Sequence, residues 1–380
     1  MDYCASIRLN TYFTTTSTLS VDFKQIGRAG VLSLRARVIL RLCGQQEAEI
    51  PMWERPPSVS APNGAHLPHL PALNGLRLLA FLLVFVHHMP APESFSIILG
   101  KINSLGWAGV DIFLVISSFL IFHLFILEWD KTRSIDVGSF YIRRLLRLYP
   151  LMLAFPILML CIYPATLSAM LRVVGLALLS DNLIAWFKGY NDIEFSAHLW
   201  TLSFEFQAYL LMPFAYLAFR RFAFERFVIG MALVYLFCFA LRIVFTTLGA
   251  PHPIVWATPF LRPDSFFFGF CLAVGVFNRV PLWASAIALL AAVVVISASP
   301  LPWASVVGSA LVYPAVAIAG LTAVMLALRS AIVGGILSWG PVAYLGKISF
   351  GLYVFHVWAI KLSADVLNSF GPNIEPAPEI

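Results

Sequence analysis

Residues 73–89 read LNGLRLLAFLLVFVHHM, an apolar run that contains an arginine and a histidine. Arg77 and His88 are eleven residues apart, which at about 100° per residue places both side chains on the same face of a helix. A guanidinium or imidazole group inside a membrane helix is costly, so such a residue is first considered functional. The stretch therefore predicts a membrane helix with a functional polar face.

The composition extends this prediction to most of the chain. The 380 residues are 60% hydrophobic and 12% charged, whereas a soluble domain carries about 25% charged residues. A membrane span needs about 20 apolar residues, and the apolar runs after residue 76 leave room for about ten spans. The fold class we expect is all-α: a polytopic transmembrane bundle of about ten helices.

Charge and cysteine content argue against two other kinds of site. The net charge of +6 is weak evidence for a nucleic-acid partner, because the basic residues sit mostly in short loops, where they set membrane orientation. The five cysteines are scattered and show neither a CxxC motif nor a metal-ligand spacing. We expect the lipid bilayer as a partner, and neither nucleic acid nor a bound metal.

The chain divides into three parts. Residues 1–70 are basic and then Pro-rich, which predicts a disordered cytoplasmic segment before the membrane domain at 71–366 and a short polar tail at 367–380. Within the first part, IGRAGVLSLRARVILRLCG has the pattern of a basic amphipathic helix on a membrane surface. Alternatively, the protein starts at Met52 and the residues before it are a gene-model extension.

The distribution of basic residues conflicts with ten simple spans. The loop predicted at 128–147 is basic and therefore cytoplasmic, which puts the N-terminus inside. The basic cluster at 220–226 should also be cytoplasmic, but ten spans would put it outside. We therefore expect that one segment is re-entrant or that one span is miscounted, and 170–187 is the best candidate because it is short and opens with Arg172. The predicted segments are 75–91, 107–127, 147–165, 170–187, 198–219, 226–248, 260–278, 282–298, 304–328 and 340–364.

Two polar clusters each allow a functional and a structural interpretation. In GVDIFLVISSFL, Asp111 and Ser118 share a helix face, and Asp111 is either a site residue or a cap that complements the helix dipole. In FYIRRLLRLYP, Arg143 and Arg147 lie one turn apart. Because arginine forks bind phosphate, they form either a clamp for a phosphate-bearing cosubstrate or a cytoplasmic anchor.

A third cluster lies in HLWTLSFEFQAYLLMP. His198, Glu205 and Tyr209 fall on one helix face at spacings of seven and four. An imidazole and a carboxylate beside a hydroxyl favour a groove that handles protons or binds a hydroxyl group. The alternative is a hydrogen-bond network that only joins helices.

The fourth cluster lies in YLGKISFGLYVFHVWAI. Ser349, Tyr353 and His356 form one polar stripe, which is either part of a site or structural packing. In FLRPDSFFFGF, Arg262 and Asp264 are predicted to form an intramembrane or interfacial ion pair.

With these motifs in order, the chain resembles the membrane-bound acyltransferase-3 family over about residues 71–365. That family moves acyl groups, often acetyl from acetyl-CoA, onto hydroxyls of carbohydrates and other acceptors at the bacterial envelope. The resemblance implies a multi-pass enzyme of the bacterial inner (plasma) membrane, with acyl-CoA as cosubstrate and no permanently bound cofactor. The five motifs are LNGLRLLAFLLVFVHH, WAGVDIFLVISSFL, FYIRRLLRLYP, HLWTLSFEFQAYLLMP and LGKISFGLYVFH.

The match to the family pattern is close but not complete. The first family motif is Arg-x10-His, which Arg77 and His88 satisfy and His87 does not. The family usually has Ser-Gly where this chain has Ser117–Ser118, which puts tight helix packing there in doubt. The glutamate of the fourth motif is retained as Glu205. We expect a stand-alone member without an esterase-like domain after the membrane part.

The resemblance also implies roles for these residues. His88 would be the general base that deprotonates the acceptor hydroxyl, or would carry the acyl group, and Arg77 would orient or charge-balance the site. The remaining assignments are Glu205 as a further catalytic residue, Arg143, Arg144 and Arg147 for the CoA phosphates, and His198, Tyr353, His356 and Asp111 on the substrate side.

Two other functions are compatible with the same residues. Intramembrane His, Glu and Arg also suit a proton-coupled transporter or a lipid-linked glycan flippase, although the chain shows no internal repeat of the kind many transporters have. A non-catalytic scaffold or degenerate acyltransferase is the other alternative. The first predicts substrate flux without an acyl donor, and the second predicts that His88 is dispensable.

Overall fold

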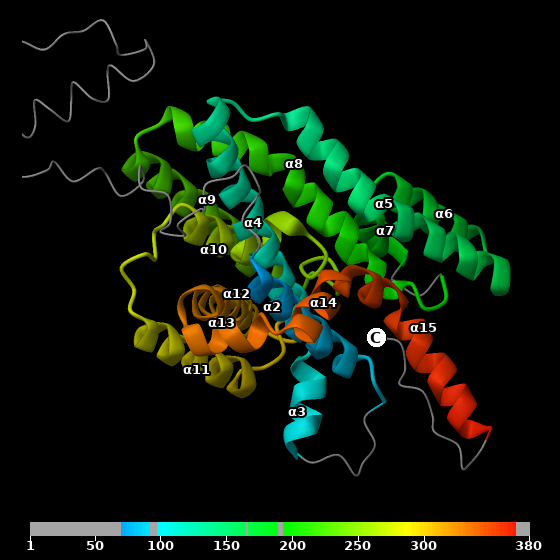
Figure 1. The fold of residues 1–380 in the computed structure, drawn as a ribbon. Helices are drawn as coiled ribbons and strands as arrows, with labels where there is room; N and C mark the ends of the chain where they lie inside the picture. The colour runs from blue at the N-terminus through cyan, green and yellow to red at the C-terminus, as the bar shows by residue number, and fades with distance from the viewer. Residues whose placement is uncertain (1–69, 91–96, 165, 189–192, 370–380) are drawn as a thin grey trace, which may run out of the picture. The chain divides into compact units, whose positions relative to one another are not determined.

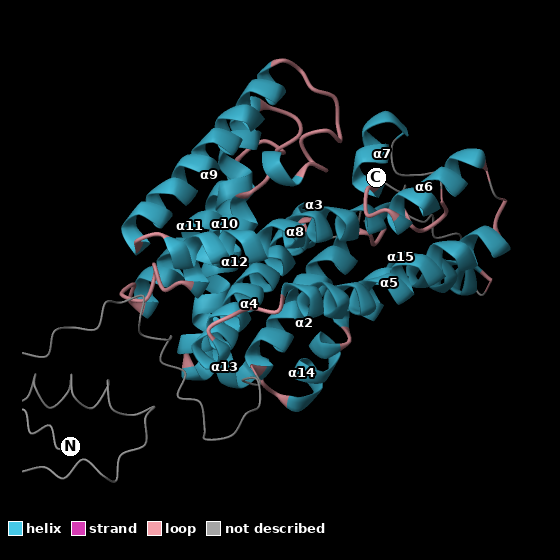
Figure 2. Ribbon diagram, turned by 90° about the horizontal axis from the view of Figure 1, so that it is seen from above, coloured by secondary structure: helices cyan, strands magenta, loops and turns pink. Residues whose placement is uncertain are grey.

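The computed structural model describes residues 70–90, 97–164, 166–188 and 193–369. The predictions for the N-terminal segment and for most of the tail lie outside these residues. All regular secondary structure in the described ranges is helical (Figure 2), which confirms the all-α fold class. The helices are α2 (Pro71–His87), α3 (Ile97–Leu105), α4 (Ala108–Thr132), α5 (Val137–Ile162), α6 (Leu167–Ala177), α7 (Asp181–Lys188), η2 (Ala197–Leu199), α8 (Trp200–Arg221), α9 (Phe224–Thr247), η3 (Pro259–Leu261), α10 (Asp264–Ala273), α11 (Leu282–Ala298), α12 (Val306–Arg329), α13 (Ala331–Leu337), α14 (Gly340–Lys347) and α15 (Ser349–Asn368).

The apolar helices fall into two length classes. Six are long and apolar enough to cross a membrane: α4, α5, α8 with its preceding 3₁₀ turn, α9, α12 and α15. Four shorter apolar helices, α2, α6, α10 and α11, complete a set close to the predicted ten. The chain is an integral, multi-pass membrane protein.

The prediction that 170–187 is not a simple span is confirmed. This stretch forms two short helices, α6 and α7, separated by a turn in which Leu179 has a positive φ of 56°. Arg172 on α6 and Asp181 on α7 form a fully buried ion pair of 2.6 Å across the turn. Neither helix reaches the ~20 residues that a crossing needs, so the pair behaves as a hairpin.

The predicted basic loop at 128–147 is wrong. Only residues 133–136 separate α4 from α5, and α5 begins ten residues before the predicted span. Asp136 caps this helix by accepting a hydrogen bond of 2.9 Å from the backbone N–H of Ser139, and arginine is a good helix former. The arginines at 143–147 therefore project from a helix.

Helices α2, α4 and α12 lie in the middle of the bundle, between α9 and α11 on one side and α5 and α15 on the other (Figures 1 and 2). Close packing against α4 is retained where the family's Ser-Gly is replaced by two serines. Gly269 on α10 faces Ser118, and a Cβ at that glycine would lie 2.6 Å from the Ser118 Cβ. The glycine that permits close packing thus comes from α10 instead of α4, so the second serine does not prevent the two helices from packing tightly.

Candidate active site

A cationic cavity of about 70 Å³ lies between α2, α5 and α8. Its charged side chains are Arg77 from α2, Arg144 and Arg147 from α5, and Glu205 from α8, and Tyr209 from α8 is one of its hydroxyl side chains. Sequence positions more than a hundred residues apart thus meet in one place. We call it the arginine cavity.

The arginine cavity has an excess of positive charge. The Tyr209 hydroxyl donates a hydrogen bond to Glu205, and the Arg144 guanidinium lies 5.5 Å from the centre of the Tyr209 ring. Among the described residues, Arg77, Arg144 and Arg147 form no ion pair with a carboxylate. Three guanidinium groups against one carboxylate make this cavity suited to an anion.

A second cavity, of about 180 Å³, is lined by histidines and aromatic rings. His88, at the end of α2, and His198, just before α8, both line it. His356 on α15 lies directly behind them, with its ring centre 4.8 Å from each of the other two. We call it the histidine cavity. Its other members include Val84, His87, Trp107, Val110, Trp200, Thr201, His252, Trp256, Trp303 and Tyr353.

The hydrogen bonds of His88 and His356 define which nitrogens carry protons. The His356 Nδ1 lies 2.6 Å from the Tyr353 carbonyl oxygen, and the His88 Nδ1 lies 2.9 Å from that of Val84. Since a carbonyl can only accept, both Nδ1 atoms are donors in the neutral rings. His88 Nδ1 also lies 3.3 Å from the unprotonated Nε2 of His356. The remaining nitrogen, His88 Nε2, is therefore a free base.

His198 is buried, but its ring nitrogens lack the hydrogen bonds that buried polar atoms usually form. It is 5% exposed, and neither ring nitrogen has a hydrogen-bond partner of normal geometry in the described part of the chain. Its carbonyl oxygen instead accepts hydrogen bonds from Thr201 (2.9 Å) and from the Tyr353 hydroxyl (3.0 Å). Across the described ranges, no group of three or more His, Cys, Asp or Glu side chains is arranged to hold a metal ion.

The two cavities adjoin. Val110, Thr201 and Tyr353 line both of them. The Thr201 Oγ1 lies 2.7 Å from the Tyr353 hydroxyl, so this pair and the Val110 side chain form the boundary between the cavities. An acyl group that passes from one cavity to the other would have to cross here.

The structure places Arg77 and His88 in different cavities. The two residues share a helix face, but eleven residues correspond to about 16 Å along the helix axis, and they line different cavities. Glu205 likewise lies with the arginines, whereas His198 lies with the histidines. Arg143 is exposed on the outer side of α5 and lines neither cavity.

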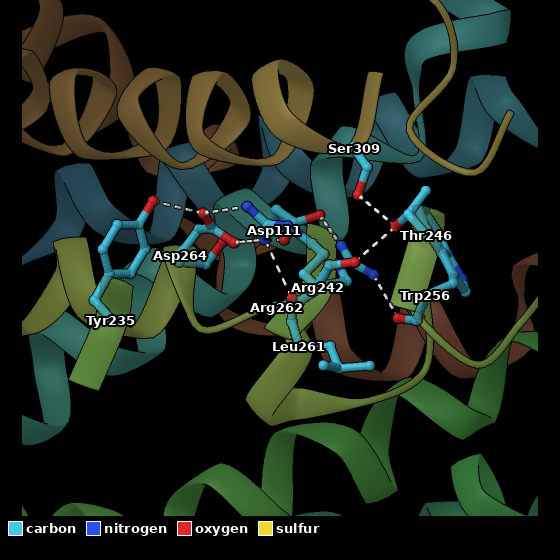
Figure 3. A network of polar contacts seen from close by, with 10 residues as sticks. Asp111, Tyr235, Arg242, Thr246, Trp256, Leu261, Arg262, Asp264 and Ser309 are labelled. Atoms are coloured by element: carbon cyan, nitrogen blue, oxygen red, sulfur yellow. Dashed lines mark hydrogen bonds and ion pairs between the residues drawn. The ribbon is translucent and has the colours of Figure 1, made fainter. Parts of the chain in front are cut away.

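Asp111 and Arg262 belong to a buried ion-pair network next to the histidine cavity (Figure 3). The predicted pair of Arg262 with Asp264 is wrong, because Arg262 pairs with Asp111 and Asp264 pairs with Arg242. Asp111 also accepts a hydrogen bond of 3.0 Å from Ser265 and lines neither cavity. Its carboxylate joins α4 to the segment before α10.

The aromatic lining of the histidine cavity was not predicted. Trp107, Trp256 and Trp303 come from separate turns, and His252 lies in the same turn as Trp256, so no periodic pattern links the three tryptophans in the sequence. A usable signal was their position in short segments between apolar runs, where tryptophan is common at membrane interfaces. Thr201 could have been recognised because it lies between His198 and Glu205 on the same helix.

Comparison with known proteins agrees with this architecture. A family model described as an acyltransferase domain matches residues 70–380. The peptidoglycan O-acetyltransferase OatA of Listeria monocytogenes is 29% identical over 338 residues, which cover 80% of this chain and 52% of that protein. The O-acetyltransferase OatA of Staphylococcus aureus is 34% identical over 157 residues, or 38% of this chain and 24% of that protein.

The chain thus spans about half the length of the Listeria relative. No solved structure matches it. The family model, however, covers the whole described bundle, including both cavities. The chain belongs to the acyltransferase-3 family.

Proposed function

We propose that this protein is a membrane O-acyltransferase that transfers an acyl group, with acetyl as the first choice, from acyl-CoA to a hydroxyl of an envelope carbohydrate. The observation that carries the proposal is the adjacency of a cationic cavity and a histidine cavity that holds a free imidazole nitrogen. The family and the relatives named as O-acetyltransferases support O-acetyl transfer. The donor and the roles of individual residues are our own assignment.

The arginine cavity would receive the donor. Coenzyme A carries phosphates, and the guanidinium groups of Arg77, Arg144 and Arg147 are suited to bind them. With the phosphates held there, the thioester would point toward the boundary at Thr201 and Tyr353. Glu205, held by Tyr209, would limit the excess positive charge and orient the arginines.

The basic residues at the helix ends support entry of the acyl donor from the cytoplasmic face of the membrane. The junctions between α4 and α5 and between α8 and α9, and the end of α12, carry the basic residues and are cytoplasmic by the positive-inside rule. The histidine cavity instead lies at the opposite ends of α2, α4 and α8. Donor and acceptor would thus reach the protein from opposite faces of the membrane and meet inside it.

His88 would act as the general base. Its Nε2 would take the proton of the acceptor hydroxyl, whose oxygen forms the new bond to the acyl carbon while the carbon–sulfur bond breaks. The departing CoA thiolate would then accept the proton from His88, which returns the ring to its neutral form. The contact between His88 Nδ1–H and His356 would hold the ring in this tautomer and stabilise the imidazolium.

The test is label transfer from labelled acetyl-CoA into envelope glycan, using membranes that contain equal amounts of wild type, His88→Ala and His123→Leu. His123 is also buried, stacks on Phe119 and lines neither cavity, so it is the matched control. General-base catalysis contributes about 10²- to 10⁴-fold, so His88→Ala should lose at least that much transfer while the control retains it. Equal transfer by His88→Ala would exclude His88 as the base. Movement of glycan across liposome membranes without any acyl donor would instead support the alternative function, a transporter or flippase.

A further inference from the structure

Three tryptophans from distant segments line the histidine cavity and pack edge to face on one another. The ring centres of Trp107 and Trp256 are 5.1 Å apart, those of Trp256 and Trp303 are 5.1 Å apart, and those of Trp107 and Trp303 are 5.7 Å apart. Trp107 precedes α4, Trp256 lies in the segment between α9 and η3, and Trp303 precedes α12. We refer to them as the tryptophan wall.

The tryptophan wall runs from the interior of the cavity to the surface. Trp107 is 2% exposed, whereas Trp303 is 37% exposed. The ring of His252, which is also exposed, lies 5.9 Å from that of Trp303. A ligand that enters past Trp303 would therefore meet aromatic surface along its way toward His88.

The cavity also contains polar atoms that lack a partner. The Trp107 Nε1 and both ring nitrogens of His198 are buried without a hydrogen bond of normal geometry among the described residues. A buried polar atom without a partner is unfavourable, so these atoms favour a ligand with several hydroxyl groups. An apolar lipid chain would bury them without satisfying them.

Trp256 is held in place from behind by Arg262 (Figure 3). The Arg262 Nη1 donates a hydrogen bond of 2.7 Å to the Trp256 carbonyl oxygen, and its guanidinium carbon lies 4.3 Å from the centre of the Trp256 ring. Asp111 fixes Arg262 through their ion pair. The wall is thus preorganised, which lowers the entropy cost of binding.

From these observations we infer that the tryptophan wall is a stacking platform for a pyranose ring of the acceptor, a role that rests on the proposed transfer reaction. One face of a pyranose presents C–H groups, which pack against the electron-rich face of an indole. The hydroxyls at the ring edge then reach the open nitrogens of His198 and Trp107. This arrangement presents one hydroxyl to His88 Nε2.

The test measures sugar binding and acyl transfer separately, on the full-length protein in lipid nanodiscs. The probes are methyl β-glucopyranoside, methyl N-acetyl-β-glucosaminide and a GlcNAc–MurNAc tetrasaccharide, with the open-chain polyol sorbitol for comparison. The variants are Trp303→Ala, Trp303→Phe and Trp256→Ala. The control is Trp283→Ala, because Trp283 on α11 is 69% exposed and lines neither cavity.

We expect at least one pyranoside to bind the wild type and the Trp283 variant equally, and more tightly than sorbitol. Truncating an aromatic anchor typically costs more than 1 kcal/mol, so Trp303→Ala and Trp256→Ala should weaken binding about tenfold, while Trp303→Phe keeps part of the affinity. In transfer assays the same variants should raise KM for the sugar and leave KM for acetyl-CoA unchanged.

Two results would overturn the platform, and both differ from failure of the transferase. The first is wild-type protein that binds none of the pyranosides at millimolar concentration. The second is transfer to a sugar with the same sugar KM in wild type, Trp303→Ala and Trp256→Ala. If the pyranosides bind and the variants weaken binding, but no label is transferred, the platform stands and the proposed reaction fails.

Discussion

The Nε2 of His356 lies 3.3 Å from the Nδ1 of His88, so that α15 supports the imidazole whose Nε2 is free in the histidine cavity. The two residues are 268 positions apart in the chain. Because His356 Nδ1–H is committed to the Tyr353 carbonyl, its Nε2 can only accept from His88. Together with the Val84 carbonyl, which lies 2.9 Å from the same nitrogen, this contact keeps the proton of His88 on Nδ1 and leaves Nε2 free, as a general base requires.

The first prediction concerns this contact. His356→Ala removes the side-chain acceptor for His88 Nδ1–H and leaves only the Val84 carbonyl, so kcat for acyl transfer should fall about 10- to 100-fold while KM for acetyl-CoA stays unchanged. His356→Gln, whose amide oxygen can accept the same hydrogen bond, should restore part of the rate. Steady-state kinetics with labelled acetyl-CoA measures both constants. A fall in apparent donor affinity without a fall in kcat would show that His356 does not act through His88.

The second prediction concerns the arginine cavity. Arg144→Gln removes one of three unpaired cations, so KM for acetyl-CoA should rise about tenfold with little change in kcat, since charged hydrogen bonds contribute about 1.5–3 kcal/mol. Arg221→Gln, at the exposed end of α8, is the control and should leave KM unchanged. Donor binding measured with radiolabelled acetyl-CoA reports the same effect. An unchanged donor KM in the Arg144 variant would place the phosphates elsewhere.

Relationships within a single helix could be predicted from the sequence. The shared face of Asp111 and Ser118 is confirmed, because both side chains contact the start of α10 through Ser265 and Phe266. Glu205 and Tyr209, four residues apart, are hydrogen-bonded. Helical periodicity determines which side chains share a face, and it held wherever the helix itself was identified.

Relationships between helices, and position along a helix, could not be predicted in this way. A shared face does not give the position along the helix axis: Arg77 and His88 lie about three turns apart and line two different, adjoining cavities. Sequence proximity suggested that Arg262 pairs with Asp264, but the turn into α10 directs the two side chains toward different helices. Only tertiary packing determines such partners.

The third prediction concerns the boundary between the cavities. Val110 lines both of them, so Val110→Phe should obstruct the passage of the acyl group and lower transfer about 100-fold, because misplacement by about 1 Å costs roughly that much. Acetyl-CoA binding to the same membranes should remain. Val234→Phe on α9, where the side chain is 56% exposed, is the size-matched control. Full transfer by the Val110 variant would mean that the acyl group takes another route.

The fourth prediction concerns the ion pair behind the tryptophan wall. Asp111 and Arg262 are 3% and 2% exposed, so Asp111→Asn leaves a buried arginine without its counterion and should lower the free energy of unfolding by about 3–5 kcal/mol. Thermal unfolding in detergent measures the loss, and Asp130→Asn, at an exposed position near the end of α4, should not change it. An unchanged melting temperature for Asp111→Asn would show that the pair does not stabilise the fold.

Replacing both Asp111 and Arg262 distinguishes the contribution of their ion pair to stability from its role in positioning Trp256. The double variant Asp111→Leu with Arg262→Met removes both charges and should recover most of the lost stability, because apolar replacements of a buried ion pair are often neutral. It also removes the hydrogen bond from Arg262 to the Trp256 carbonyl. We therefore expect a protein that unfolds near the wild-type temperature but has a several-fold higher KM for the sugar acceptor. A wild-type sugar KM in this variant would mean that the Trp256 ring is positioned by its neighbours Trp107 and Trp303 alone.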